Sequence, residues 1–201
     1  MSEQDQVVEQ APARWVYAAT ALSVLMWAGL VNPHPWWFLP AYAVFACAWG
    51  AGVAIDLVRH ELPDRFTVAP VALFLAALLP WVTVHDQFNR WLATAIASLV
   101  TAVVLFVLAF INPKGFGLGD VKLGFATGAA LGWIGSGATS EVILSAVGLA
   151  MIGIAVGFVL MAVLSLLLLA LKQADRSTDI AFGPFMVAGV LMAPWASSLL
   201  L

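Results

Sequence analysis

Long apolar runs, most of them about twenty residues or longer, recur along this chain and leave few folds open to it. A helix needs about 20 apolar residues to cross the hydrocarbon core of a bilayer. The runs are continuous and do not alternate in period two, which argues against a transmembrane barrel. With 63% hydrophobic and 9% charged residues, the composition is not that of a soluble domain. The sequence therefore predicts an all-α fold, a polytopic membrane helical bundle.

The lengths of the runs predict about seven transmembrane helices. We expect a disordered cytoplasmic tail at 1–13, an extra N-terminal transmembrane helix within 14–35, and a main membrane domain over 36–201. The fifth span is short and rich in glycine and alanine, so we expect it to pack closely against its neighbours. The expected spans are 15–31, 36–55, 66–84, 91–111, 121–134, 142–171 and 180–201.

Basic residues predict how the chain lies in the membrane. In this arrangement every lysine and arginine except Arg90 falls on one side, and basic residues concentrate in cytoplasmic loops. We therefore expect a cell inner (plasma) membrane protein with the N-terminus and loops 56–65, 112–120 and 172–179 in the cytoplasm. Several tryptophans at span ends resemble interface anchors: Trp15, Trp36, Trp37, Trp91 and Trp133.

Two aspartates stand out because carboxylates near lipid are costly and usually functional. Asp56 ends the second expected span and Asp120 begins the fifth. Two spans separate them, so both lie at the cytoplasmic face and can meet in the bundle. Close carboxylates share one proton. The ionised one can then activate water while the protonated one stabilises a carbonyl oxygen.

Other residues near this pair can be explained by local structure. Asp64 follows Pro63 at the start of a span, which is typical of a helix N-cap. The glycines before Asp120, including Gly117 and Gly119, allow the backbone to adopt unusual dihedrals or to come close to another chain. They indicate either a flexible turn or an extended segment beside which a substrate backbone could lie. Lys122 is expected to point to a different helix face, toward headgroups or the loop.

No cofactor or metal is expected. Cys47 is the one cysteine of the chain, and the histidines have no metal-ligand spacing. The chain also lacks a basic cluster, so nucleic acid is not an expected partner.

Three segments together resemble one known family. GLGDVKL is similar to the GxGDxKL motif of the type IV prepilin peptidases, and IDLVRHELPDRFT is similar to the segment around their first catalytic aspartate. AFGPFMVAG resembles their last conserved element, although Ala181 stands where proline is common. The resemblance covers roughly residues 40–201, which leaves the first span unexplained.

The resemblance implies a membrane aspartyl endopeptidase in which Asp56 and Asp120 are the catalytic pair. The expected partners are prepilin or pseudopilin substrates, the lipid bilayer, and pilus or secretion assembly machinery. Many relatives carry a cysteine-rich segment and also N-methylate the product. Here Cys47 is the single cysteine, so we expect peptidase activity without N-methyltransferase activity.

Two other functions fit the aspartates. An intramembrane protease of the presenilin or signal-peptide-peptidase type shares Gly-x-Gly-Asp, but usually has a Tyr-Asp pair and a Pro-Ala-Leu motif, both missing here. A proton-coupled transporter would use Asp56 and Asp120 as relay groups. A relay would more naturally lie at mid-membrane, whereas both aspartates lie at one edge.

Overall fold

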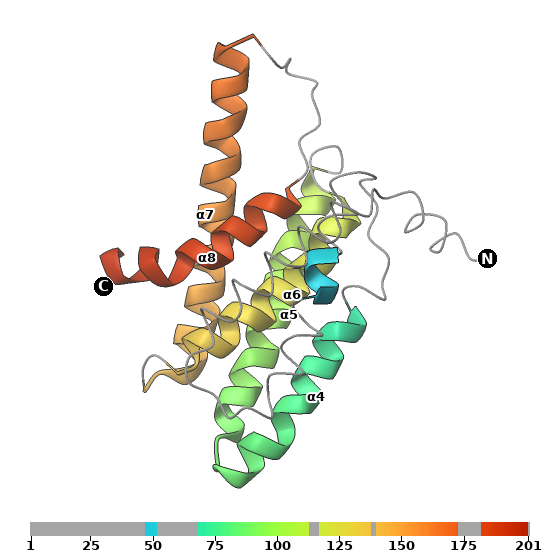
Figure 1. The fold of residues 1–201 in the computed structure, drawn as a ribbon, viewed down its shortest axis with the longest axis vertical. Coiled ribbons are helices and arrows are strands. Elements are labelled where there is room, and N and C mark those ends of the chain that lie inside the picture. The colour runs from blue at the N-terminus through green and yellow to red at the C-terminus, as the bar shows by residue number, and fades with distance from the viewer. Residues whose placement is uncertain (1–46, 52–67, 113–116, 138–139, 173–181, 201) are drawn as a thin grey trace, which may run out of the picture.

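A computed structural model of the chain describes residues 47–51, 68–112, 117–137, 140–172 and 182–200. Within these ranges every regular element is a helix, which confirms the all-α class (Figure 1). Residues 47–51 form a helical turn. The longer helices are α4 (Val68–Val84), α5 (Phe88–Ile111), α6 (Leu118–Gly135), α7 (Val142–Ala170) and α8 (Gly183–Leu200).

The last five expected spans each coincide with one of these helices. The tail at 1–13, the extra helix within 14–35 and most of the span at 36–55 lie outside the described residues, so the number of seven is not confirmed. By length and apolar composition, α5 and α7 can cross a membrane, while α4 and α8 are shorter apolar helices.

The outer faces of the long helices are apolar. On α5 and α7, large hydrophobic side chains point away from the rest of the protein. Such a surface suits contact with lipid, where exposed apolar groups carry no hydration penalty. The exposed residues include Leu99, Val103, Phe106 and Phe110 of α5 and Val159, Val163, Leu166 and Leu167 of α7.

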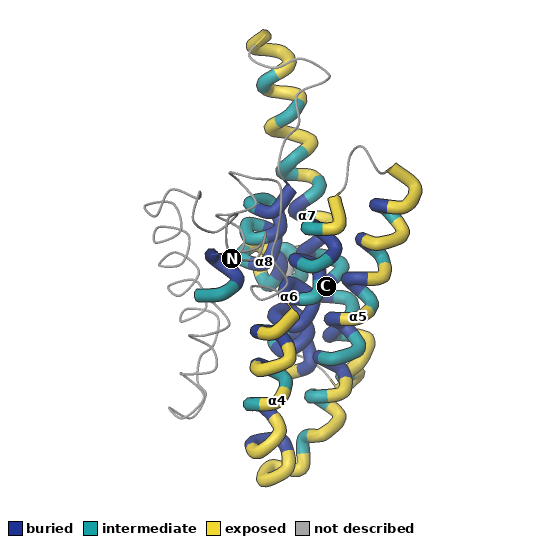
Figure 2. The backbone as a smooth tube through the Cα atoms, turned by 90° about the vertical axis from the view of Figure 1, so that its right-hand side faces the viewer, coloured by how far each residue is buried: buried dark blue, intermediate teal, exposed yellow. Residues whose placement is uncertain are grey.

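Helix α6 is the centre of the bundle. It contacts α4, α5, α7 and α8, and most of its residues are buried (Figure 2). Helix α8 crosses α7, and the C-terminal half of α7 projects beyond the other helices (Figure 1). The polar and glycine-rich sequence of α6 is therefore shielded by its neighbours.

A glycine stripe brings α6 close to α5. Within this stripe Gly128 comes closest to backbone atoms of α5, since an added Cβ would lie 2.7 Å from both the Ala97 carbonyl oxygen and the Ser98 Cα. These are backbone atoms, so α5 cannot make room by rotating a side chain. The expected close packing of this span is confirmed. The stripe repeats every fourth residue, at Gly124, Gly128 and Gly132.

Replacing Gly128 with alanine tests this packing. We expect Gly128→Ala to lower the free energy of unfolding by about 1–3 kcal/mol, because its methyl group forces α5 and α6 apart. The matched control is Gly148→Ala on α7, where no atom lies within 4 Å of the added Cβ. That variant should be neutral or slightly stabilised by its higher helix propensity. Thermal unfolding in detergent measures both, and equal melting temperatures would contradict the packing argument.

Candidate active site

Asp120 is buried in the first turn of α6. The helix begins at Leu118, earlier than the expected start at residue 121, so Asp120 lies inside the helix and not before it. Its side chain is 8% exposed. This placement agrees with the expectation that the carboxylate sits where the fifth span begins.

A reciprocal pair of hydrogen bonds joins Asp120 to Gly117. The backbone N–H of Gly117 donates to Asp120 Oδ2 at 3.1 Å, and the backbone N–H of Asp120 donates to the Gly117 carbonyl at 3.1 Å. The carboxylate thereby accepts a backbone donor at the helix start and becomes fixed in orientation. This is the side-chain half of a capping box, in which a carboxylate three residues into the helix bonds back to the N-cap residue.

Opposing effects act on the ionised form of Asp120. Burial alone penalises a carboxylate strongly. A charge-assisted hydrogen bond and the positive end of the α6 dipole both oppose that penalty. Lys122 is half-buried two residues further along α6, and residues two apart do not face each other on a helix. Its contact with headgroups or with the loop remains a prediction.

Of the glycines before Asp120, the structure describes Gly117 and Gly119, and neither has unusual dihedrals. The extended backbone at Gly117 agrees with the expectation of an extended segment there, and its role beside a substrate stays a prediction. Gly117 has φ −87° and ψ 161°, which is extended backbone open to any residue. Gly119 is helical, within the first turn of α6, and no described glycine has a positive φ. The surroundings of Gly117 are open, because the nearest atom to an added Cβ would be the Gly119 nitrogen at 3.7 Å.

The remaining predicted site residues cannot be placed. Asp56, Pro63 and Asp64 lie outside the described residues, so the pairing of Asp56 with Asp120 and the capping by Asp64 stay predictions. Within the described ranges, no three His, Cys, Asp or Glu side chains are grouped so as to hold a metal ion.

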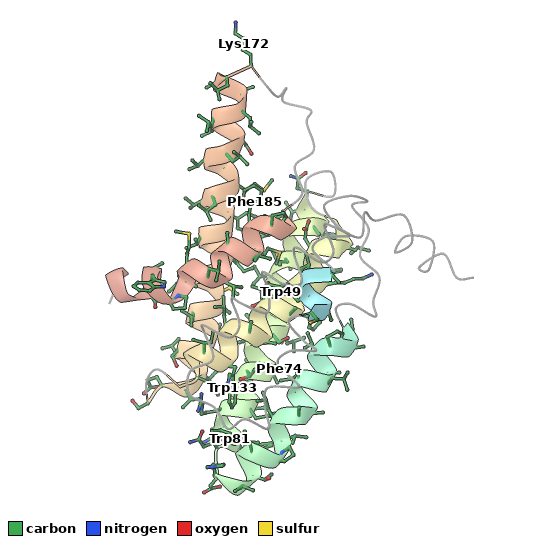
Figure 3. All side chains as sticks on the ribbon, viewed as in Figure 1. Trp49, Phe74, Trp81, Trp133, Lys172 and Phe185 are labelled. Carbon is green, nitrogen blue, oxygen red and sulfur yellow. The ribbon has the colours of Figure 1, made fainter. Side chains whose placement is uncertain are left out.

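The C-terminal motif residues pack α8 onto α7. Phe182 is buried and stacks on Phe158 with ring centroids 4.5 Å apart. Across the same contact, an added Cβ on Gly157 would lie 2.9 Å from the carbonyl oxygen of Phe185, which Figure 3 labels on α8. Within the described residues, this segment therefore serves helix packing.

Near the other end of α6, Arg90 forms a cluster with Trp81 and Trp133 that the sequence did not reveal. The Arg90 guanidinium lies 4.4 Å from the Trp133 ring centroid and 5.7 Å from that of Trp81. It also donates to Gln87 Oε1 at 3.0 Å, and to the Trp133 carbonyl and Ser136 Oγ at 3.4 Å each. Figure 3 shows Trp81 and Trp133 at this end. The available signal was that Arg90 is the one basic residue expected on the side opposite the others, in a chain with several tryptophans.

Trp133 consequently does not serve as an interface anchor. Its side chain is 1% exposed and packs edge-to-face on Trp81, with ring centroids 5.6 Å apart. The prediction for this residue is wrong because a tryptophan near a helix end can face inward as well as toward headgroups.

These features define an all-helical, largely apolar bundle that buries a hydrogen-bonded aspartate at the start of its central helix. The sequence matches the profile of the Type IV leader peptidase family over residues 43–196. The chain belongs to this peptidase family. No curated protein and no solved structure gives a significant match.

Variants of Gly117 test the contact that holds Asp120. Gly117→Ala should leave stability unchanged within about 0.5 kcal/mol, because its backbone is extended and its surroundings are open. Gly117→Pro removes the N–H donor and should lower the free energy of unfolding by about 1.5–3 kcal/mol, the range for hydrogen bonds to charged groups. Thermal unfolding of both proteins in detergent compares them. A proline variant as stable as the alanine variant would rule out a significant role for this hydrogen bond.

Proposed function

We propose that the chain is a membrane aspartyl endopeptidase that removes the leader peptide of type IV prepilin-like proteins. Membership of the type IV leader peptidase family supports the peptidase class. The observation that carries the mechanism is the buried carboxylate of Asp120, fixed by the Gly117 N–H at the start of α6.

In the proposed reaction, Asp56 and Asp120 form a dyad that holds one proton. The ionised carboxylate removes a proton from water, whose oxygen attacks the scissile carbonyl carbon. The protonated carboxyl group gives its proton to the carbonyl oxygen and stabilises the tetrahedral intermediate. Collapse of that intermediate breaks the C–N bond, and the departing amine takes up a proton. The reaction needs neither a metal nor a covalent intermediate.

The proposed substrates are prepilins or pseudopilins, whose basic leader precedes an apolar helix. Their apolar helix suits a bundle whose outer faces are themselves apolar. The bias of basic residues supports a multi-pass protein of the inner (plasma) membrane with a cytoplasmic active site. Pilus or secretion assembly machinery would then use the cleaved product.

The family match favours this function over the two alternatives. A presenilin-type intramembrane protease would cut within a substrate helix, and a transporter would move protons without cleaving peptide. Both alternatives also use Asp56 and Asp120, so a cleavage assay with a defined prepilin separates them from the proposal.

Loss of either aspartate should abolish cleavage. Asp56→Asn and Asp120→Asn should each lower the rate at least about 100-fold, because each removes the general base or the general acid. The double variant should be little worse than each single variant, since the pair acts as a unit. Cleavage of a purified prepilin in detergent is the assay, with membrane levels checked by immunoblot.

Asp64→Asn is the matched control for these variants. It makes the same substitution in the same polar region, and asparagine caps a helix nearly as well as aspartate. It should keep most of the activity. Normal cleavage by Asp56→Asn or Asp120→Asn would refute the dyad, and a proton-transport signal lost in the same variants would indicate the relay.

The cleaved product should keep an unmodified amino terminus. The reason is that no cysteine-rich segment accompanies Cys47 within this sequence. Mass spectrometry of pilin cleaved by this protein alone, with a methyl donor present, tests the point. A product heavier by one methyl group would show that the chain is also a methyltransferase.

A further inference from the structure

Ser98 differs from the other described serines and threonines in where its hydroxyl points. Its Oγ donates to the carbonyl oxygen of Phe125 at 2.7 Å, which links α5 to α6. The side chain is 2% exposed. In the described part of the chain, the other hydroxyls that donate a hydrogen bond give it to a carbonyl three or four residues earlier, at Thr83, Thr94, Thr101, Ser136, Ser145, Ser165 and Ser197.

This bond depends on the close approach of the two helices. A serine side chain is short, so it can reach a carbonyl on another helix only where the two backbones nearly touch. Gly128 provides that approach, since an added Cβ there would lie 2.7 Å from the Cα of Ser98. The packing of side-chain ridges into grooves restricts the axial positions of two helices. A hydrogen bond between them adds a preference for the one position in which its donor meets its acceptor.

The bonded carbonyl is close to the candidate catalytic carboxylate. Phe125 follows Asp120 by five residues on the same helix, about 7.5 Å along the axis. A helix is stiff over this distance, so an axial shift at Phe125 moves Asp120 by a similar amount. Misplacement of a reacting group by about 1 Å can lower a rate about 100-fold.

We propose that Ser98 is a positioning residue for the peptidase reaction: its hydrogen bond to the Phe125 carbonyl fixes the axial register of α6 and so places Asp120. Ser98 acts through the helix and does not touch substrate. The kinetic test of this inference rests on the proposed peptidase function, whereas the test by amide hydrogen exchange does not.

Ser98→Ala tests this role, with Ser165→Ala as the matched control. Ser165 makes the same kind of hydrogen bond, at 2.7 Å, but to Met161 within its own helix α7. For Ser98→Ala, kcat per folded enzyme should fall at least about fivefold while KM stays within about twofold. Ser165→Ala should keep both constants within about twofold of the wild type. A kcat for Ser98→Ala within twofold of the wild type would overturn the proposal.

Amide hydrogen exchange gives a second readout that needs no substrate. In detergent-solubilised Ser98→Ala, amides in the first two turns of α6 should exchange at least about threefold faster than in Ser165→Ala. Equal exchange in the two variants would overturn the proposal even if the protein cleaves no prepilin. Failure of the wild-type protein to cleave would instead refute the proposed function, and exchange would still decide the role of Ser98.

Discussion

The near contact between the backbones of α5 and α6 is the constraint on which the described structure depends. A Cβ at Gly128 would collide with backbone atoms of α5, so the two helices can adopt this separation only with glycine there. Close packing of this kind is a main source of helix association in lipid, where apolar side chains gain little by leaving the bilayer. Helix α6 is not among the helices apolar enough to be a candidate span, and its neighbours cover it. The glycine stripe thus allows a helix with Asp120 and Lys122 to occupy the centre of an apolar bundle.

Near each end of α6 lies an ionisable side chain whose charged form suits the helix dipole there. Asp120 lies in the first turn, where the helix dipole is positive, and Arg90 donates to the Trp133 carbonyl near the last turn. Each end therefore combines a favourable dipole interaction with a specific hydrogen bond. The Arg90 cluster also joins α4, α5 and α6 through Trp81 and Trp133. The helix that carries the candidate catalytic group is held at both ends as well as along its side.

Much of this arrangement follows from the sequence, because apolar runs determine where helices lie. The last five expected spans match α4–α8, and Asp120 was recognisable as a rare carboxylate in an apolar chain. Contacts between helices were harder to predict. The pattern around Trp133 fits an interface anchor and a buried ring equally well, and the sequence left open whether Gly117 lies in a flexible turn or in extended backbone. No local pattern in the sequence marks Ser98, because the carbonyl that it bonds belongs to Phe125, 27 residues further along the chain.

The length of α7 has a separate consequence. Its 29 residues extend about 43 Å, whereas the hydrocarbon core of a bilayer is about 30 Å thick. Apolar side chains continue to its C-terminal end, where Figure 3 shows Lys172 beyond the last turn. In a membrane, such hydrophobic mismatch is relieved by tilting the helix or by thickening the surrounding bilayer. Because α8 packs on α7, a tilt of α7 would carry α8 with it. The length of the surrounding lipid acyl chains would therefore affect the orientation of both helices.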